Sequence, residues 1–74
     1  MNVLDLQIGE HAKVKKISAS SDLKRRLISF GVIKGADLRL LATAPAKSTV
    51  EIEVGKMKIA LRKEEAKKIE VEKV

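Results

Sequence analysis

The feature that most constrains this sequence is a period of two in its apolar residues, repeated in several short runs. Residues 49–54 alternate polar with apolar side chains, Gly55-Lys56 interrupts the pattern, and residues 57–62 resume it. Successive side chains of a strand point to opposite faces, so each run predicts a strand with one apolar face. The glycine-containing connection then predicts a hairpin, with Met57 among the core residues of its second strand.

Three further runs predict strands in the same way. Residues 12–17 alternate until the last residue breaks the period, which indicates a bulge or an abrupt end. Residues 36–43 predict a strand with Leu38, Leu40 and Ala42 on one face, and residues 69–72 predict the last strand. Residues 3–8 are rich in apolar side chains before a glycine, and we expect a short extended arm that ends in a turn.

One segment has helical spacing instead. Leu23, Leu27 and Phe30 stand at positions i, i+4 and i+7, which places them on one face of a helix that follows a serine-rich stretch. Gly31 is suited to end this helix, because glycine readily adopts the left-handed conformation that many helix ends require. Gly31 and Gly35 then define a connector, and they are either plain turn residues or residues that shape a groove for a partner.

The expected order of elements is a strand, a helix, three strands, a short helix at residues 63–68 and a final strand. Residues 44–48 hold the only proline and are expected to form an exposed loop. A chain of 74 residues is too short for two packed sheets, and a small sheet hides its edges by closing on itself. We therefore predict a mainly β single domain over residues 1–74, with one or two short helices, built as a small SH3-like antiparallel barrel.

The composition excludes several kinds of chemistry. There is no cysteine and a single histidine, His11, so disulfides, thiolate metal sites and histidine-pair metal motifs are ruled out. We interpret His11 as an exposed loop residue. No run approaches the roughly 18–20 apolar residues of a membrane span, which predicts a cytoplasmic protein. A domain of this size has no room for a walled-in catalytic cavity, so we expect a binding module rather than an enzyme.

The chain is basic, with 16 Lys and Arg residues against 10 Asp and Glu residues and a formal net charge of +6. Some of the basic residues gather in two neighbouring predicted elements, where they form either a patch for phosphates or an acidic partner, or a solubilising surface. These residues are Lys13, Lys15, Lys16, Lys24, Arg25 and Arg26. Phe30 is the only aromatic residue, which argues against the stacking platforms of single-strand nucleic-acid binders.

The order and spacing of these features resemble one known family over almost the whole chain. The matching motifs are Val3-x-x-Leu6-x-x-Gly9-Glu10, Ala12-x-Val14-x-x-Ile17, Leu23-x-x-Arg26-Leu27-x-x-Phe30-Gly31-Val32-x-x-Gly35-x-x-Leu38, Val54-Gly55 and Ile59-Ala60-Leu61-Arg62-x-x-Glu65-Ala66-x-x-Ile69-x-Val71. Together they resemble the FeoA family of ferrous iron transport proteins. Two departures are that Phe30 stands where this family usually has Met or Leu, and that residues 46–48 lack its common Gly and Pro.

This resemblance implies a cytoplasmic SH3-like barrel that catalyses nothing itself. It implies a partner, the FeoB-type ferrous iron transporter with its cytoplasmic GTPase region, and contact with the membrane only through that partner. It also implies similarity in fold to the C-terminal domain of DtxR-type metal-dependent repressors. Fe2+ enters only through the resemblance, because the sequence shows no ligand set for a metal. We expect a monomer or a weak homo-oligomer that forms no stable complex with nucleic acid.

We expect the partner to bind the predicted helix and the connector that follows it. The residues concerned are Lys24, Arg25, Arg26, Leu27, Gly31 and Gly35. Two alternatives stay open. One is a small basic barrel that binds nucleic acid through its positive charge, and the other is a module that binds Fe2+ directly.

Overall fold

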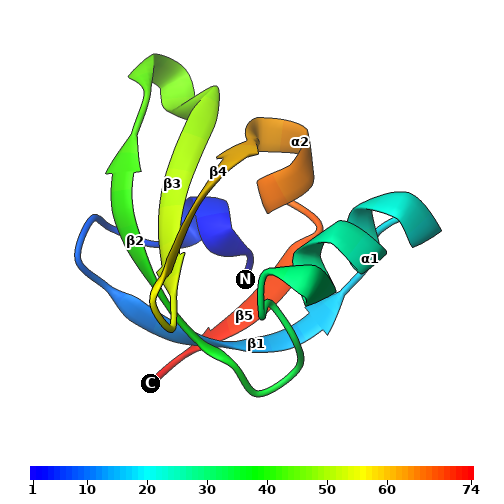
Figure 1. Ribbon diagram of the computed structural model, residues 1–74. Coiled ribbons are helices and arrows are strands. Elements are labelled where there is room, and N and C mark those ends of the chain that lie inside the picture. The colour runs from blue at the N-terminus through cyan, green and yellow to red at the C-terminus, as the bar shows by residue number, and fades with distance from the viewer.

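The alternating runs form a single antiparallel sheet in the computed structural model, which describes residues 1–74 (Figure 1). Its order is β4-β3-β2-β1-β5, so the hairpin of β3 and β4 lies at one side and the last strand at the other. The strands are β1 (His11–Ile17), β2 (Asp37–Thr43), β3 (Thr49–Val54), β4 (Met57–Arg62) and β5 (Ile69–Lys73). All five predicted strands and the hairpin are confirmed.

The sheet curls around its core, and two β-bulges help it to do so. The register shifts between Val14 and Lys16 in β1, and again between Leu40 and Ala42 in β2. A bulge places an extra residue in one strand, which bends the strand and increases its twist. The predicted irregularity at the end of the first strand is therefore confirmed, whereas the bulge in β2 has no counterpart in the predictions.

No ladder joins the two outer strands, β4 and β5. The helix α2 (Lys63–Ala66) leads from β4 to β5 and lies over this gap (Figure 1). The N-terminal segment lies along β5, where the Val71 N–H donates to the Met1 carbonyl (2.8 Å) and Asn2 forms a bridge with Glu70. The predicted mainly β antiparallel barrel with two short helices is confirmed, and segments other than strands complete its wall.

The core is a single cluster of 16 buried residues, and all of them are apolar. Every strand contributes to it, as do the N-terminal segment, α1 and α2. No polar or charged residue is buried. Burial of apolar surface is therefore the main force that holds this sheet in its curled form.

Three local predictions are wrong. Residues 3–8 are not extended: Val3–Asp5 form a 3-10 turn (η1), because the Asp5 carboxylate accepts from the Asn2 N–H (2.8 Å) and the Asn2 side-chain oxygen accepts from the Leu4 N–H (2.8 Å). Ala42 does not share the face of Leu38 and Leu40, which are buried, because the bulge in β2 turns its side chain to the outer, exposed face. Met57 is 47% exposed, because it lies beside the hairpin turn on the outer strand β4.

The loop at residues 44–48 is exposed, as predicted. It contains a short 3-10 turn, η2 (Pro45–Lys47), in which Ala46 and Lys47 have φ values of 58° and 56°. The Lys47 Nζ donates to the Leu4 carbonyl (2.5 Å), so the loop is tied to the N-terminal turn. This contact joins the loop to the N-terminal turn, two segments that are far apart in the sequence.

The helix α1 (Ser21–Ser29) begins after the Ser20 cap and ends in a Schellman motif, as its sequence indicates. Gly31 has a φ of 91°, and the chain reverses there so that the Val32 N–H donates to the Leu27 carbonyl (2.9 Å). The two residues joined by this bond, Leu27 and Val32, are both fully buried. The cap thus fastens the end of α1 to the core.

We expect Leu27→Ala to lower the free energy of unfolding by about 2–5 kcal/mol, because it leaves a cavity where a buried side chain was. The neighbouring Ile28→Ala is the matched control, since Ile28 is 48% exposed and its loss leaves no cavity. Urea denaturation followed by circular dichroism measures both. Equal effects of the two substitutions would contradict the assignment of Leu27 to the core.

Glu65 holds the first turn of α2, and this predicts a pH dependence. Its Oε1 accepts from the Arg62 N–H (2.9 Å) and its Oε2 pairs with Arg26. The Arg62 N–H, with a smaller contribution from Arg26, lowers the pKa of Glu65 below its ordinary value, although partial burial opposes the shift. The carboxylate therefore stabilises the fold above its unfolded pKa of about 4.3. This stabilisation is lost as the pH falls through the lower, folded pKa.

We expect Glu65→Gln to be less stable than the wild type at neutral pH, by up to about 1 kcal/mol, the size usual for an exposed ion pair. The difference should shrink as the pH falls from about 4.3 through the lower pKa of folded Glu65, because below that pKa both proteins carry a neutral side chain there. Urea titrations at several pH values test this. Glu64→Gln is the control, because Glu64 is exposed and makes no side-chain hydrogen bond or ion pair. A difference that persists unchanged into acid would contradict the role of the charge.

Candidate functional site

The helix α1 has a surface groove on each side. Lys24 and Ile28 line one groove, and Arg26 and Phe30 line the other. Each pair is spaced i, i+4, so its members share one face of the helix, and the two pairs lie on different faces. Leu27 lies between these faces and is the only fully buried residue of α1. The helix therefore rests on a narrow contact, with hollow surface on either side.

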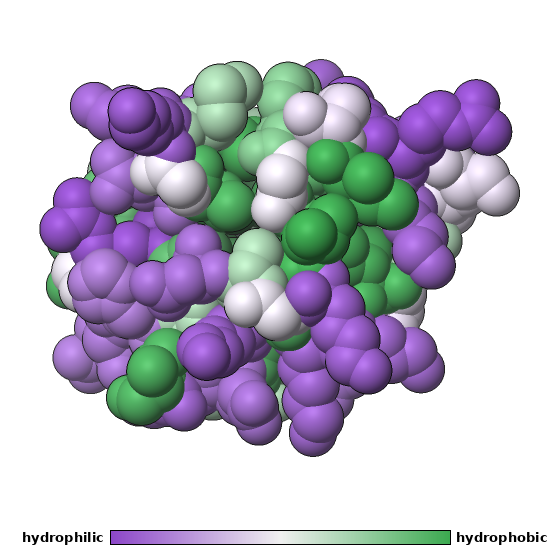
Figure 2. All heavy atoms as spheres, turned by 60° about the horizontal axis from the view of Figure 1, so that its bottom comes forward, coloured by the Kyte–Doolittle hydropathy of each residue, from purple (hydrophilic) through white to green (hydrophobic).

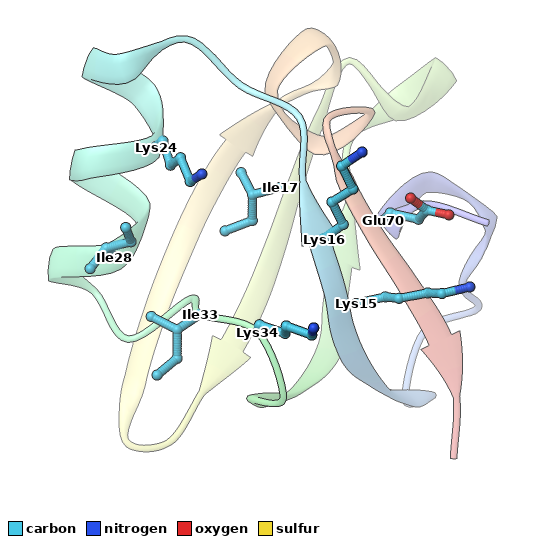
Figure 3. A pocket seen from close by; sticks show the side chains of 8 residues that line it. All are labelled: Lys15, Lys16, Ile17, Lys24, Ile28, Ile33, Lys34 and Glu70. Carbon is cyan, nitrogen blue, oxygen red and sulfur yellow. The ribbon is translucent and has the colours of Figure 1, made fainter.

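We call the first hollow the isoleucine groove. It has a volume of about 540 Å3 and lies between α1, β1, β5 and the connector after α1. Ile17, Ile28 and Ile33 supply its apolar surface, and they come from β1, α1 and the connector respectively (Figure 3). Its remaining lining residues are Lys15, Lys16, Lys24, Lys34 and Glu70. Figure 2 shows a hydrophobic patch edged by hydrophilic residues on the side of the molecule that carries the lower part of Figure 1.

The isoleucines are exposed for structural reasons. Ile28 and Ile33 are each 48% exposed, and Ile17 is partly buried against the core. Ile28 lies off the buried stripe of α1. The reversal at Gly31 directs Val32 into the core, and the next residue, Ile33, stays outside. Contiguous exposed aliphatic surface with a polar rim is typical of interaction sites.

The lysines of the groove are free of acidic partners. None of Lys15, Lys16, Lys24 and Lys34 makes an ion pair or a side-chain hydrogen bond. Lys15 and Lys16 are consecutive, yet both are exposed and both line the groove, because the bulge in β1 breaks the alternation of faces. Glu70 lies opposite Lys16 in the β1–β5 register. Four lysines against one glutamate leave the groove positively charged.

The second groove, on the other side of α1, is more polar and has a volume of about 670 Å3. Residues 58–62 of β4 line it, together with Arg26, Phe30, Thr49 and Glu65. The Arg26–Glu65 ion pair crosses from α1 to α2 here. The charge of Arg26 is therefore already paired, unlike the charges of the isoleucine groove.

The structure divides the six residues predicted to bind a partner. Lys24 lines the isoleucine groove, Arg26 lines the second groove, and Arg25 is exposed but lines neither. Leu27 is fully buried, so it supports the surface from beneath and offers no side-chain area to a partner. Gly31 and Gly35, with φ values of 91° and 87°, are exposed and stand at the two ends of the connector.

Sequence reasoning missed most of the isoleucine groove. Lys15, Lys16 and Lys24 belong to the basic patch that the sequence indicated, but Lys13, Arg25 and Arg26 of that patch do not line this groove. The aliphatic floor and two further lining residues, Lys34 and Glu70, were not foreseen. The available signal was that Ile28 and Ile33 fall outside the predicted core stripe.

The structure holds no cluster of three or more His, Cys, Asp or Glu residues able to bind a metal ion. His11 begins β1, so its assignment to a loop is wrong, although its side chain is exposed as expected. Its Nδ1 lies 3.7 Å from the Asp37 Oδ2. None of the helices has the length and apolar character needed to cross a membrane.

The sequence comparisons agree on one family. The model of the FeoA domain matches residues 1–73. A candidate Fe(2+) transport protein A of Campylobacter jejuni is 35% identical over 71 residues, which cover 96% of each chain. A protein of Porphyromonas gingivalis in which Fe(2+) transport protein A is fused to the Fe(2+) transporter FeoB is 26% identical, and the match covers 97% of this chain and 8% of the fusion protein.

Solved structures show the same fold. The FeoA protein of Chlorobium tepidum superposes with a TM-score of 0.93 and 31% identity, over all of this chain and 70% of that one. The zinc complex of Stenotrophomonas maltophilia FeoA, described as an SH3 domain protein, gives a TM-score of 0.85 and 30% identity over 97% of this chain and 89% of that one. A manganese-dependent transcriptional repressor gives a TM-score of 0.88 at 21% identity, over all of this chain and 36% of the repressor, which indicates a shared fold alone. The SH3-like barrel and the likeness to repressors are thus confirmed, and the chain belongs to the FeoA family of Fe(2+) transport proteins.

Proposed function

We propose that this chain is a non-catalytic, cytoplasmic accessory protein of ferrous iron uptake, which docks on the cytoplasmic GTPase region of an FeoB-type transporter and modulates it. The observation that carries the proposal is the fusion of Fe(2+) transport protein A with FeoB in one relative. A covalent link holds two binding partners at a high effective concentration. A separate chain of the same family has to reach the same partner through its surface. In this proposal it meets the membrane only through the transporter.

The surface around α1 supports docking. It offers exposed aliphatic side chains, unpaired lysines and a connector whose shape depends on Gly31 and Gly35. In this proposal Lys24, Arg25 and Arg26 contact the partner, and the two glycines hold the connector in the required conformation. Electrostatic complementarity at such a surface raises the rate of association and restricts the choice of partner.

A nucleic-acid-binding barrel is the second candidate, and the unpaired lysines are the observation in its favour. This candidate requires affinity that falls steeply with salt, because each phosphate contact releases counterions. Docking on the transporter through a mixed apolar and charged surface requires a weaker dependence on salt. Titration of the protein with the transporter and with duplex DNA at several salt concentrations separates the two.

We expect Arg26→Glu to weaken binding to the full-length transporter by about tenfold or more, which is the usual effect of substituting an important charged residue in an interface. The substitution reverses the charge in the second groove and places a carboxylate next to Glu65, which loosens the tie between α1 and α2. Biolayer interferometry with the transporter in nanodiscs, in the presence and absence of GTP, measures the affinity.

Lys56→Glu is the matched control, because it changes the net charge equally from an exposed hairpin turn that lines neither groove. Arg26→Gln removes the charge without adding repulsion, and it should weaken binding less. Thermal melts establish that each variant is folded. The proposal fails when the wild-type protein shows no affinity for the full-length transporter at low salt.

A further inference from the structure

The floor of the isoleucine groove is suited to aliphatic side chains. Ile17, Ile28 and Ile33 line it from three separate elements (Figure 3). Ile28 and Ile33 keep almost half of their surface in contact with water. A partner that covers them removes apolar area from water on both molecules, which favours association.

The rim of the groove specifies the charge of what binds there. Four lysines line the groove without any ion pair within the chain. Carboxylates brought to this rim gain attraction at small desolvation cost, because the ammonium groups remain at the surface. The complementary ligand is therefore both aliphatic and acidic.

We propose that the isoleucine groove binds a peptide segment of the transporter that presents aliphatic side chains to Ile17, Ile28 and Ile33 and carboxylates to the surrounding lysines. The origin of the segment rests on the proposed function. Its chemistry rests on the groove alone. The Asp and Glu side chains of the segment flank its aliphatic residues, as the lysines flank the isoleucines.

The shape of the groove favours a peptide over an anionic membrane surface. The isoleucines line a hollow of about 540 Å3, within the range of roughly 300–1,000 Å3 that ligand sites span. An amphipathic helix that binds a bilayer surface instead buries a continuous apolar face among the lipids. A hollow with a charged rim matches a segment that projects from its partner.

Glu70 makes the two sides of the groove differ in charge. It lies on the sheet side, opposite Lys16, and its side chain makes no ion pair or side-chain hydrogen bond. Lys24 and Lys34 lie on the side of α1 and the connector, where no acidic residue lines the groove (Figure 3). The carboxylates of the bound segment therefore lie nearest Lys24 and Lys34. Removal of the Glu70 charge should tighten binding, because it relieves a repulsion.

The test uses the folded, isotope-labelled chain and short overlapping peptides that cover the cytoplasmic sequence of the transporter. Amide chemical shifts followed by NMR report which peptides bind and where. We expect the tightest peptide to contain aliphatic residues flanked by Asp or Glu, and to shift the amides of Ile17, Ile28 and Ile33. A charge-inverted copy of that peptide, with Lys in place of each acidic residue, should bind at least about tenfold more weakly.

Substitutions in the chain test the same contacts. Ile33→Asp should weaken peptide binding by about tenfold or more, because it places a charge in the apolar floor. Ile8→Asp is the matched control, since Ile8 is an isoleucine that is 64% exposed and does not line the groove. The double variant Lys24→Glu/Lys34→Glu should no longer bind the acidic peptide and should bind its charge-inverted copy instead. The Glu70→Gln variant should bind the acidic peptide several-fold more tightly.

The possible outcomes separate this inference from the proposed function. If the full-length transporter binds the chain and Ile33→Asp leaves that affinity unchanged, the groove assignment is overturned while docking stands. If the transporter does not bind but an acidic aliphatic peptide does, the chemistry of the groove stands and the docking proposal fails. Binding of phosphatidylserine vesicles through the groove, with no peptide bound, would overturn the inference in favour of a membrane surface.

Discussion

This structure depends on one physical constraint, which is that a small sheet has to cover its own apolar face. The core consists of 16 apolar residues with no buried polar group, and no second sheet exists to cover it. The five strands therefore curl, and the bulges at Val14/Lys16 and Leu40/Ala42 provide the bends. The gap between β4 and β5 is bridged by α2, and the N-terminal segment lies along β5. Only α1 lies outside this closed arrangement, fastened by Leu27 and the cap at Gly31.

The candidate site follows from that arrangement. The bulge that bends β1 also places Lys15 and Lys16 together at the groove. The reversal that buries Val32 leaves Ile33 in solvent. Because α1 contacts the core through a narrow stripe, the surface is hollow on both sides of it. Features that stabilise the fold thus also produce its most distinctive surface.

The fold by itself does not distinguish this protein from a repressor domain. A manganese-dependent repressor shares the fold at 21% identity, while the FeoA relatives share both fold and family. Folds support many functions, and the site on the fold decides among them. Here the candidate site is the surface around α1, where unpaired lysines and exposed isoleucines meet. In our proposal this surface recognises another protein.

The sequence by itself determined the local elements, because strand alternation, helix spacing and glycine conformations are properties of neighbouring residues. The hairpin around Gly55, the cap at Gly31 and the bulged first strand were predictable for this reason. Only the tertiary structure decided which apolar side chains remained uncovered, and so Met57 and Ala42 were misplaced. The isoleucine groove joins residues from β1, α1, the connector after α1 and β5, and their proximity depends on how the sheet curls. Sequence patterns report the period of the backbone, whereas exposure depends on what packs against it.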